Sequence, residues 1–355
     1  MPTDPASLAA AVDAHLHNFL LTRRRMLEPV GAETLALVDE ATVSVEGGKR
    51  LRPAFCVAGW QVAGGNAGDP RVVRAAAALE LLQASALVHD DLMDGSDTRR
   101  GRLASHRAFA ERHAAAGWQV SADKFGAGAA ILLGDLLLTW SHELFRTSGF
   151  DPAIVDRAAP LFDACTTEVV AGQYLDLVSQ AMGRSDEDLA LRVVRFKAAS
   201  YTVVRPLHIG AALAGADETL LAALTAYGEP LGIAFQLRDD ILGVFGDPKQ
   251  TGKPAGDDLR EGKRTVLLAR ATRAADPLGR ALIDRCVGHP DLTADDLAGL
   301  RDVIVDSGAL ASVEATITEL ESRAHAALDA VCAGRDDTAR SVLEALTSAA
   351  LRRIR

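Results

Sequence analysis

Residues 71–94 read RVVRAAAALELLQASALVHDDLMD, an alanine- and leucine-rich stretch that ends in three aspartates. Alanine and leucine favour the α-helix, and apolar residues on nearly every side indicate that this helix is central in the fold. Asp90 and Asp94 are four residues apart and project from one helical face, whereas Asp91 lies about 100° away. Gly95 follows as a residue that ends helices.

A second acidic stretch, RDDILGVFGD, occupies residues 238–247 and also follows apolar sequence that predicts a helix. Like charges one helical turn apart repel by about 0.2–0.5 kcal/mol, so two such clusters indicate a counter-cation. Carboxylates at this spacing suit a hard, oxygen-binding ion such as Mg²⁺, which proteins usually share with the phosphates of a substrate. The sequence therefore predicts two magnesium-binding aspartate clusters.

Almost the whole chain reads as helix, and strand-like alternation is scarce, so we expect an all-α protein with ten or more helices. No linker, low-complexity stretch or internal repeat divides the 355 residues, so we expect a single domain over residues 1–355. The main predicted helices cover residues 71–94, 124–144, 191–213, 218–245, 309–332 and 337–355, with a break near residues 228–230 and a loop over residues 246–263.

The net charge of −10 argues against a nucleic-acid partner, because nucleic-acid-binding proteins usually carry a basic surplus. It would also repel an anionic substrate, unless cation clusters such as those at residues 49–52, 99–102 and 195–197 attract it locally. The longest apolar run, residues 125–140, is broken by Asp135 and is too short to span a bilayer. With no signal-type start and four scattered cysteines, we expect a cytoplasmic protein without stable membrane insertion.

Each cation cluster allows two interpretations. Arg99 and Arg100 follow the first aspartates and could form ion pairs with them, but guanidinium groups also match phosphate oxygens in bidentate fashion. The stretch GGKRLRP at residues 47–53 could be a solvated basic turn, or its glycines could let the backbone approach a ligand. Both alternatives stay open at this point.

Further polar residues stand in apolar sequence. Gln173 and Asp176 are three residues apart in a predicted helix, where they form either an internal hydrogen-bond pair or part of a cavity wall. We expect His89 to pack behind the aspartates rather than bind metal. Residues 246–253 do not form a P-loop, because the glycine spacing is wrong and Pro254 replaces the Ser or Thr. Lys253 remains a candidate cation that closes over a bound anion.

These ordered motifs resemble those of the trans-isoprenyl diphosphate synthases, or polyprenyl synthetases, and in detail the geranylgeranyl diphosphate synthases of actinobacteria. The resemblance runs from Gly47 to about Lys263 and rests on GGKRLRP, DDLMD with TRRG, GQYLDL, FK before Tyr201, and FQLRDDILGVFGD through TGK. It implies the isoprenoid synthase fold, a bundle of mostly antiparallel helices around a deep central cavity, usually in a homodimer.

The resemblance also implies roles for individual residues. About three Mg²⁺ ions are expected per active site once substrate is bound, held by oxygen ligands. The expected metal ligands are Asp90, Asp91 and Asp94 on the allylic diphosphate and Asp239 and Asp240 on the opposite wall. Isopentenyl diphosphate is expected at Lys49, Arg52, Arg100 and Gln83, and the allylic diphosphate at Arg99, Lys197 and Lys253, with Gln173, Gln236 and Asp257 completing the polar lining. The residues expected to be catalytic are Asp90, Asp94, Lys197, Asp239 and Lys253.

The chain departs from the family pattern at two positions. Gly243 stands where many members have a third aspartate, so metal binding there rests on Asp239 with Asp240 behind it. Ala198 stands where threonine is usual, which removes one hydrogen bond near the departing carbocation and bears on rate more than on identity.

Product length is expected to depend on Ser85 and Ala86, five and four residues before Asp90, where the family uses large aromatics to stop at fifteen carbons. Both are small here, so we expect a longer product of twenty carbons. A helical wheel places Ala86 beneath Asp90 but turns Ser85 away, so Ser85 rests on the resemblance alone. The alternative is that both residues only pack helices together.

The sequence thus predicts a Mg²⁺-dependent enzyme that condenses isopentenyl diphosphate head-to-tail with an allylic diphosphate to form geranylgeranyl diphosphate. A farnesyl or longer-chain diphosphate synthase is the main alternative. A class I terpene cyclase should carry an Asn/Ser/Glu motif in place of the second aspartates and more aromatics than the 5% found here. A non-catalytic subunit of a heteromeric synthase should have lost one acidic cluster or the GGKRLRP cations, and both are present.

Overall fold

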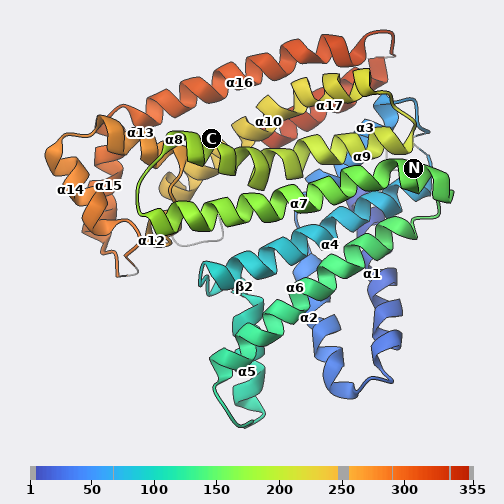
Figure 1. The fold of residues 1–355 in the computed structure, drawn as a ribbon, viewed down its shortest axis with the longest axis horizontal. Helices are drawn as coiled ribbons and strands as arrows, with labels where there is room; N and C mark the ends of the chain where they lie inside the picture. Colours follow the sequence, from blue (N-terminus) through green and yellow to red (C-terminus); the bar gives the residue numbers. More distant parts are fainter. Residues whose placement is uncertain (1–4, 67, 247–255, 290, 336, 352–355) are drawn as a thin grey trace. The chain divides into compact units, whose positions relative to one another are not determined.

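Helices make up nearly all of the structure (Figure 1). The computed structural model describes residues 5–66, 68–246, 256–289, 291–335 and 337–351. Within these residues, strands are confined to one two-stranded hairpin. The prediction of an all-α protein is confirmed.

The chain divides by its contacts into two compact units. Unit 1 comprises Met1–Ala164 and Arg205–Leu221, and unit 2 comprises Cys165–Val204 and Ala222–Arg355. The single domain expected from the sequence stays a prediction, and each unit is described by itself.

Unit 1 is built around a pair of long helices, α4 and α6, that lie side by side, with α5 packed on α6 (Figure 1). The helix α3 packs on α4 and on α9. The elements of unit 1 are α1 (Pro5–Leu27), the 3₁₀ helix η1 (Ala32–Thr34), α2 (Leu35–Val45), α3 (Leu51–Val62), α4 (Pro70–Met93), β1 (Thr98–Arg99), β2 (Arg102–Leu103), α5 (Ser105–Ala115), α6 (Ala122–Arg146), the start of α7 (Pro152–Met182), and α9 (Arg205–Leu213).

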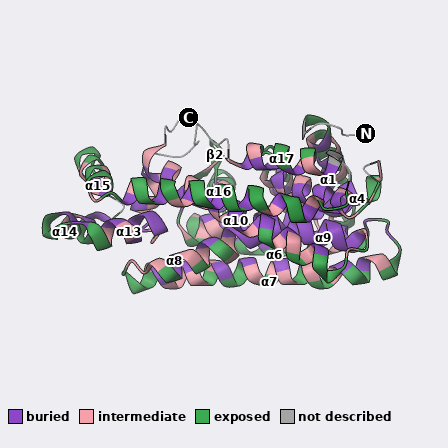
Figure 2. Ribbon diagram, turned by 90° about the horizontal axis from the view of Figure 1, so that it is seen from above, coloured by how far each residue is buried: buried purple, intermediate pink, exposed green. Residues whose placement is uncertain are grey.

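Two glycines let α3 and α9 approach closely. A Cβ on Gly59 would lie 2.1 Å from the Leu207 carbonyl oxygen, and one on Gly210 would lie 1.7 Å from the Cys56 carbonyl oxygen. Because no side chain fits at either position, the backbones themselves form the interface. The helix α9 is buried from Pro206 to Leu213 (Figure 2).

Unit 2 contains the rest of α7 and a long helix, α10, whose second half carries the second acidic cluster. The elements of unit 2 after α7 are α8 (Glu187–Val193), the π-helix η2 (Val194–Val204), α10 (Glu218–Phe245, which begins in unit 1), α12 (Asp257–Arg260), α13 (Val266–Ala274), α14 (Pro277–Cys286), α15 (Ala294–Asp306), α16 (Ala309–Cys332) and α17 (Asp337–Leu351). A Cβ on Gly232 would lie 2.6 Å from the Cα atom of Ala199, so α10 and η2 also meet backbone to backbone.

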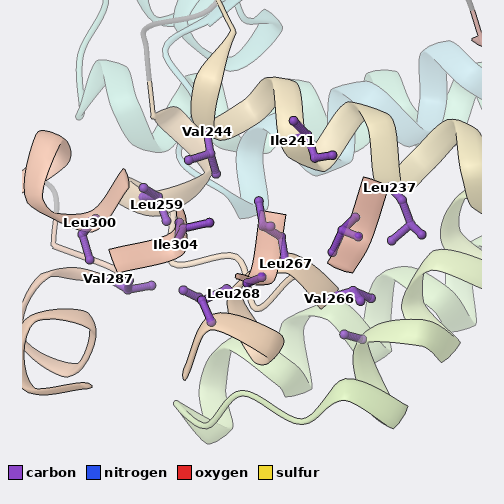
Figure 3. Close-up of a cluster of buried hydrophobic side chains, with 14 of the residues drawn as sticks. Leu237, Ile241, Val244, Leu259, Val266, Leu267, Leu268, Val287, Leu300 and Ile304 are labelled. Atoms are coloured by element: carbon purple, nitrogen blue, oxygen red, sulfur yellow. The ribbon is translucent and has the colours of Figure 1, made fainter. Parts of the chain in front are cut away.

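The core of unit 2 fixes the end of α10. Leu237, Ile241 and Val244 lie along α10 in one buried cluster with Leu259 of α12 and Ile304 of α15 (Figure 3). Burying each such side chain contributes about 1.5–3 kcal/mol. The cluster therefore holds the one-turn helix α12 against the helix that carries Asp239 and Asp240.

Most predicted helix boundaries agree with the structure to within a few residues, including those of α4, α6 and α16. The expected break near residues 228–230 is wrong, because α10 continues through Pro230. The neighbouring Tyr227 is fully buried, and its hydroxyl donates to the Leu343 carbonyl of α17 at 3.0 Å. Tertiary packing there outweighs the loss of one main-chain donor at the proline.

Two further expectations about helices need correction. The predicted helix 191–213 is three helical segments, α8, η2 and α9, with a π-helix in the middle. The predicted loop over residues 246–263 contains α12. The capping residues expected before α8 and α15 are confirmed, since Asp186 accepts from the Leu189 N–H and Thr293 forms a capping box with Asp296.

Among the residues that the structure describes, two helices, α4 and α10, are long and apolar enough to cross a membrane by length and composition alone. The most apolar windows of the two helices are 72% and 56% buried inside the protein. Central helices of soluble proteins pass the same test, and the cytoplasmic location stays a prediction. The four cysteines are free thiols, as expected, and three of them are buried.

Candidate active site

The first acidic cluster occupies the end of α4. The Asp94 N–H donates to the Asp90 carbonyl at 2.8 Å, and Gly95 then takes a positive φ of 67°, which ends the helix. Asp91 is buried, while Asp90 and Asp94 are partly exposed. The three carboxylates thus lie in different environments, as their positions around the helix predict.

Arg99 forms ion pairs with this cluster. Its Nε donates to Asp91 Oδ1 at 2.8 Å, its Nη2 also bonds to Asp91, and Nη2 lies 3.5 Å from Asp90 Oδ2. Arg99 therefore forms ion pairs with the first aspartates, and its binding of phosphate stays a prediction. Arg100 behaves differently, since its Nη1 donates to the Glu46 carbonyl at 2.7 Å.

A short hairpin that the sequence reading missed presents these arginines. Strands β1 and β2 pair antiparallel, with Thr98 opposite Leu103 and Arg99 opposite Arg102. The two-residue turn between them, Arg100 and Gly101, has φ values of 53° and 73°. Two positive φ angles are typical of the tight hairpin turn, and Gly101 at its second position was the available signal.

The glycine-rich turn between α2 and α3 lies against the same hairpin. Gly47 and Gly48 have φ values of 71° and 90°, and a Cβ on Gly48 would lie 3.2 Å from an Arg100 nitrogen. The next residue, Lys49, is exposed, and Arg52 lies in the first turn of α3. Gly48 thus lies close to a guanidinium group of the protein itself, and the approach of this turn to a ligand stays a prediction.

One cavity of about 470 Å³ in unit 1 brings parts of three sequence motifs together. Pockets of this size hold small ligands. Its lining includes Gly47 and Gly48 of the glycine-rich turn, Asp91 of α4, and Arg99 and Arg100 of the hairpin. Carboxylates and guanidinium groups thus share one hollow within unit 1.

The second acidic cluster lies on α10 in unit 2. Asp239 is partly exposed, whereas Asp240 is buried and accepts a hydrogen bond from Gln236 Nε2 at 2.8 Å. The pKa of Asp240 is raised to about 8, mainly by burial; the hydrogen bond from Gln236 opposes this rise, and the charges of Asp258 and Asp239 add to it. The order of the two aspartates, with Asp240 behind Asp239, agrees with their burial.

Asp257 was the predicted site residue of this stretch, and its neighbour Asp258 was not predicted. A Cβ on Gly243 would lie 1.8 Å from Asp258 Oδ2, so the Asp258 carboxylate occupies the space beside this glycine. The Lys263 ammonium lies 3.6 Å from Asp258 Oδ1. The unusual Gly243 is therefore the residue that makes room for a carboxylate from α12.

Two other motifs meet in unit 2. Lys197 Nζ donates to Asp176 Oδ2 at 2.6 Å, and a Cβ on Gly172 would lie 2.4 Å from the Lys197 backbone nitrogen. Asp176 thus has an internal partner, as one of the two alternatives allowed, but this partner is Lys197, and a place in a cavity wall stays a prediction. Lys197 stands in the π-helix η2, and such segments are frequent at functional sites.

The residues expected to set product length differ in orientation. Ser85 is buried, and its hydroxyl donates to the Gly134 carbonyl of α6 at 2.7 Å. Ala86 is partly exposed. His89 packs on Gly134 and contacts the Ile131 carbonyl at 3.2 Å, which matches its expected packing role.

The predicted site residues are therefore distributed between the two units. Unit 1 holds Lys49, Arg52, Gln83, Ser85, Ala86, Asp90, Asp91, Asp94, Arg99 and Arg100, and unit 2 holds Gln173, Lys197, Gln236, Asp239, Asp240 and Asp257. Lys253 lies outside the described residues. That the two aspartate clusters face one cavity stays a prediction.

Within the described part of the chain, no three His, Cys, Asp or Glu side chains could hold a metal ion by themselves. The donors on offer near the first cluster are carboxylate oxygens, which fit a hard ion. Mg²⁺ usually takes one or two carboxylates and completes its shell with water and substrate phosphates. The donor set fits that manner of binding.

Comparison with known proteins identifies the family. The family model described as Polyprenyl synthetase matches residues 36–303. The chain is 35% identical to a geranylfarnesyl diphosphate synthase of Aeropyrum pernix, over 74% of this chain and 77% of that protein. It is 33% identical to a geranylgeranyl diphosphate synthase of Mycobacterium tuberculosis, over 73% of this chain and 68% of that protein.

Solved structures give the same result. A geranylgeranyl pyrophosphate synthase from Corynebacterium glutamicum, complexed with isoprenyl diphosphate and magnesium, superposes with a TM-score of 0.95 and 40% identity, over 99% of this chain and 100% of that one. The chain belongs to the polyprenyl synthetase family, as the motifs predicted. It is an isoprenyl diphosphate synthase, an enzyme that transfers prenyl groups.

Proposed function

We propose that the protein condenses isopentenyl diphosphate head-to-tail with an allylic diphosphate, and that its product is geranylgeranyl diphosphate. The observation that carries the proposal is the contact between the aspartate-rich end of α4 and the hairpin, where Arg99 donates to Asp91 and lies 3.5 Å from Asp90. The names of the relatives support it, since they are geranylgeranyl, geranylfarnesyl and farnesyl diphosphate synthases.

Different cations are assigned to the two substrates. Arg99 and Lys197, with Lys253, hold the allylic diphosphate while its C–O bond breaks. Arg99 is hydrogen-bonded to the Asp91 carboxylate, and Lys197 is hydrogen-bonded to the Asp176 carboxylate. A cation that carboxylates already hold in place loses less conformational freedom when it binds phosphate, which lowers the cost of binding.

The second substrate is held by the glycine-rich turn and the hairpin. Lys49, Arg52 and Arg100 bind the diphosphate of isopentenyl diphosphate beside Gln83, so that its alkene reaches the allylic carbocation and a carbon–carbon bond forms. The proton lost in this step passes to the released diphosphate, and positioning supplies the entropic part of the acceleration. The remaining polar lining comes from Gln173, Gln236 and Asp257.

Magnesium is the proposed cofactor, as in the Corynebacterium structure, which was crystallised with it. Asp90, Asp91 and Asp94 would hold it at the first cluster, and Asp239 and Asp240 at the second, with about three ions once substrate is bound. Bound Mg²⁺ supplies positive charge to the leaving diphosphate. Since Asp91 is committed to Arg99, we assign direct binding at the first cluster mainly to Asp90 and Asp94.

Purified protein incubated with Mg²⁺, isopentenyl diphosphate and each allylic primer in turn tests the function. We expect twenty-carbon products, and a strong loss of turnover in Asp90→Asn and Asp239→Asn. Asp97→Asn is the matched control, because Asp97 is exposed just after the first cluster and pairs with Arg107 instead. No consumption of isopentenyl diphosphate with any primer would refute the proposal.

Product length is tested by Ala86→Tyr and Ser85→Tyr. We expect Ala86→Tyr to shorten the product to fifteen carbons, as an aromatic in the cavity would. Ser85→Tyr should mainly lower stability, because Ser85 is buried against α6 through its bond to Gly134. Chromatography measures the product length of each variant. Unchanged product length in both variants would refute the dependence of product length on these two positions.

A homodimer is also part of the proposal. On α6, Ile131 and Leu132 are 48% and 61% exposed, which is unusual for large apolar residues of a helix centre. We expect Leu132→Asp to shift the protein from dimer to monomer in light scattering. Val30→Asp, at another exposed apolar position, should leave the mass unchanged. A monomeric parent protein would contradict the dimer.

A further inference from the structure

A buried arginine stands between two exposed or partly exposed cations of the glycine-rich turn. Arg50, which lies between Lys49 and Arg52, has φ 51° and ψ 36° at the N-cap of α3. This left-handed conformation is rare for residues other than glycine, asparagine and aspartate. Contacts of the Arg50 side chain must therefore offset the cost of this backbone conformation and of burying the charge.

The Arg50 side chain ties the turn to three helices of unit 1. Its Nε and Nη2 donate to Asp13 Oδ1 of α1 at 2.9 and 2.6 Å, and Nη2 donates to the Val45 carbonyl at the end of α2 at 2.6 Å. Its Nη1 donates to Glu80 Oε2 of α4 at 2.5 Å. The side chains of Arg50 and Glu80 are each 4% exposed, so this ion pair is shielded from water.

The same glutamate acts on the hairpin. Burial lowers the pKa of Arg100, and the charge of Glu80 opposes this effect, whereas Arg50, Arg99 and Arg52 add to it. Glu80 therefore lies within electrostatic range of Arg100 as well as in contact with Arg50. One buried carboxylate on α4 links the two turns that carry Lys49, Arg52 and Arg100.

We propose that Arg50 and Glu80 form a positioning pair for the isopentenyl diphosphate site. The pair does not touch the substrate but fixes the turn that carries Lys49 and the start of α3 that carries Arg52, and Arg100 lies against Gly48 of the same turn. The inference rests on the proposed function, which assigns these three cations to isopentenyl diphosphate. Arg99, assigned to the allylic substrate, is anchored separately by Asp91. Loss of the pair should therefore weaken the binding of isopentenyl diphosphate and leave the binding of the allylic substrate nearly unchanged.

The test must separate positioning from stability. A single substitution leaves a buried charge without its partner and destabilises the protein, whereas replacing both partners by apolar residues of similar volume is often tolerated. The informative variant is thus Arg50→Met combined with Glu80→Met. The matched control is Arg23→Met with Glu143→Met, because Arg23 and Glu143 form another part-buried ion pair of unit 1. Arg50→Lys keeps the charge but not the fork of donors.

We expect the Arg50/Glu80 double variant to fold, as judged by circular dichroism and its melting temperature. Its KM for isopentenyl diphosphate should rise roughly tenfold to a hundredfold, as for a displaced binding group, with the KM for the allylic primer nearly unchanged. Calorimetric binding of isopentenyl diphosphate should weaken in parallel. Arg50→Lys should fall between the parent and the double variant, and the Arg23/Glu143 variant should show neither change.

Three results would overturn the positioning role. They are parental binding of isopentenyl diphosphate by the double variant, an equal rise in both KM values, and the same selective loss in the Arg23/Glu143 control. A parent protein that binds isopentenyl diphosphate but turns nothing over would contradict the proposed function alone. A parent that does not bind isopentenyl diphosphate at all would overturn both.

Discussion

Asp240 provides a quantitative test of the second acidic cluster. Burial raises its pKa from the ordinary 3.8 to about 8, although Gln236 donates a hydrogen bond that lowers it. In the metal-free native protein the Asp240 carboxyl therefore keeps its proton well above pH 4, whereas in the unfolded chain it loses the proton near pH 4. Between these two values the unfolded chain binds fewer protons, so this residue's contribution to the free energy of unfolding falls as the pH rises.

The size of the effect follows from the two pKa values. Each pH unit of separation corresponds to about 1.4 kcal/mol, which sets an upper limit of about 6 kcal/mol for Asp240. The contribution is constant below about pH 4 and again above about pH 8.

Asp240→Asn removes the titration while its amide oxygen still accepts from Gln236. We therefore expect the difference in unfolding free energy, variant minus parent, to increase steadily from about pH 5 to about pH 8 in urea denaturation with EDTA. Asp302→Asn, at an exposed position on α15, should give no such trend. A difference for Asp240→Asn that is flat or falls with pH would refute the reasoning.

Three further predictions concern packing and are checked by urea or thermal denaturation. Gly210→Ala should destabilise the protein by more than about 2 kcal/mol because its Cβ would meet the Cys56 backbone carbonyl of α3 at 1.7 Å, and unchanged stability would contradict this account. Gly243→Asp, which restores the family's usual residue, should lower stability because Asp258 occupies the space, and a stable variant would show that α12 can shift. Tyr227→Phe should cost about 1 kcal/mol for its buried hydrogen bonds to α17, and a neutral result would show that they contribute nothing net.

Local sequence was sufficient for much of the site. The aspartates at the end of α4 share a helical face because of their spacing, and Gly95 ends the helix where expected. The basic turn and the hairpin arginines were recognised as candidates, and the cavity of unit 1 brings parts of both together. Helix propensity and charge spacing act over a few residues, so they are readable from the chain itself.

Other features depend on partners distant in sequence. Nothing near Arg50 in the sequence indicated that it would be buried and form an ion pair with Glu80, thirty residues away. Likewise, Lys197 became the partner of Asp176, and Asp258 took the space beside Gly243. The expected break at Pro230 failed for the same reason, because packing around Tyr227 holds α10 together.

The amino-acid sequence by itself determined the helical class, the positions of the two aspartate clusters and the cations available to bind diphosphate, because these follow from composition and helical periodicity. Only the tertiary structure decided which cation each carboxylate holds and which charges are removed from water. Those pairings arise when helices far apart in the chain pack together, and the free energy of a charge depends on what then surrounds it.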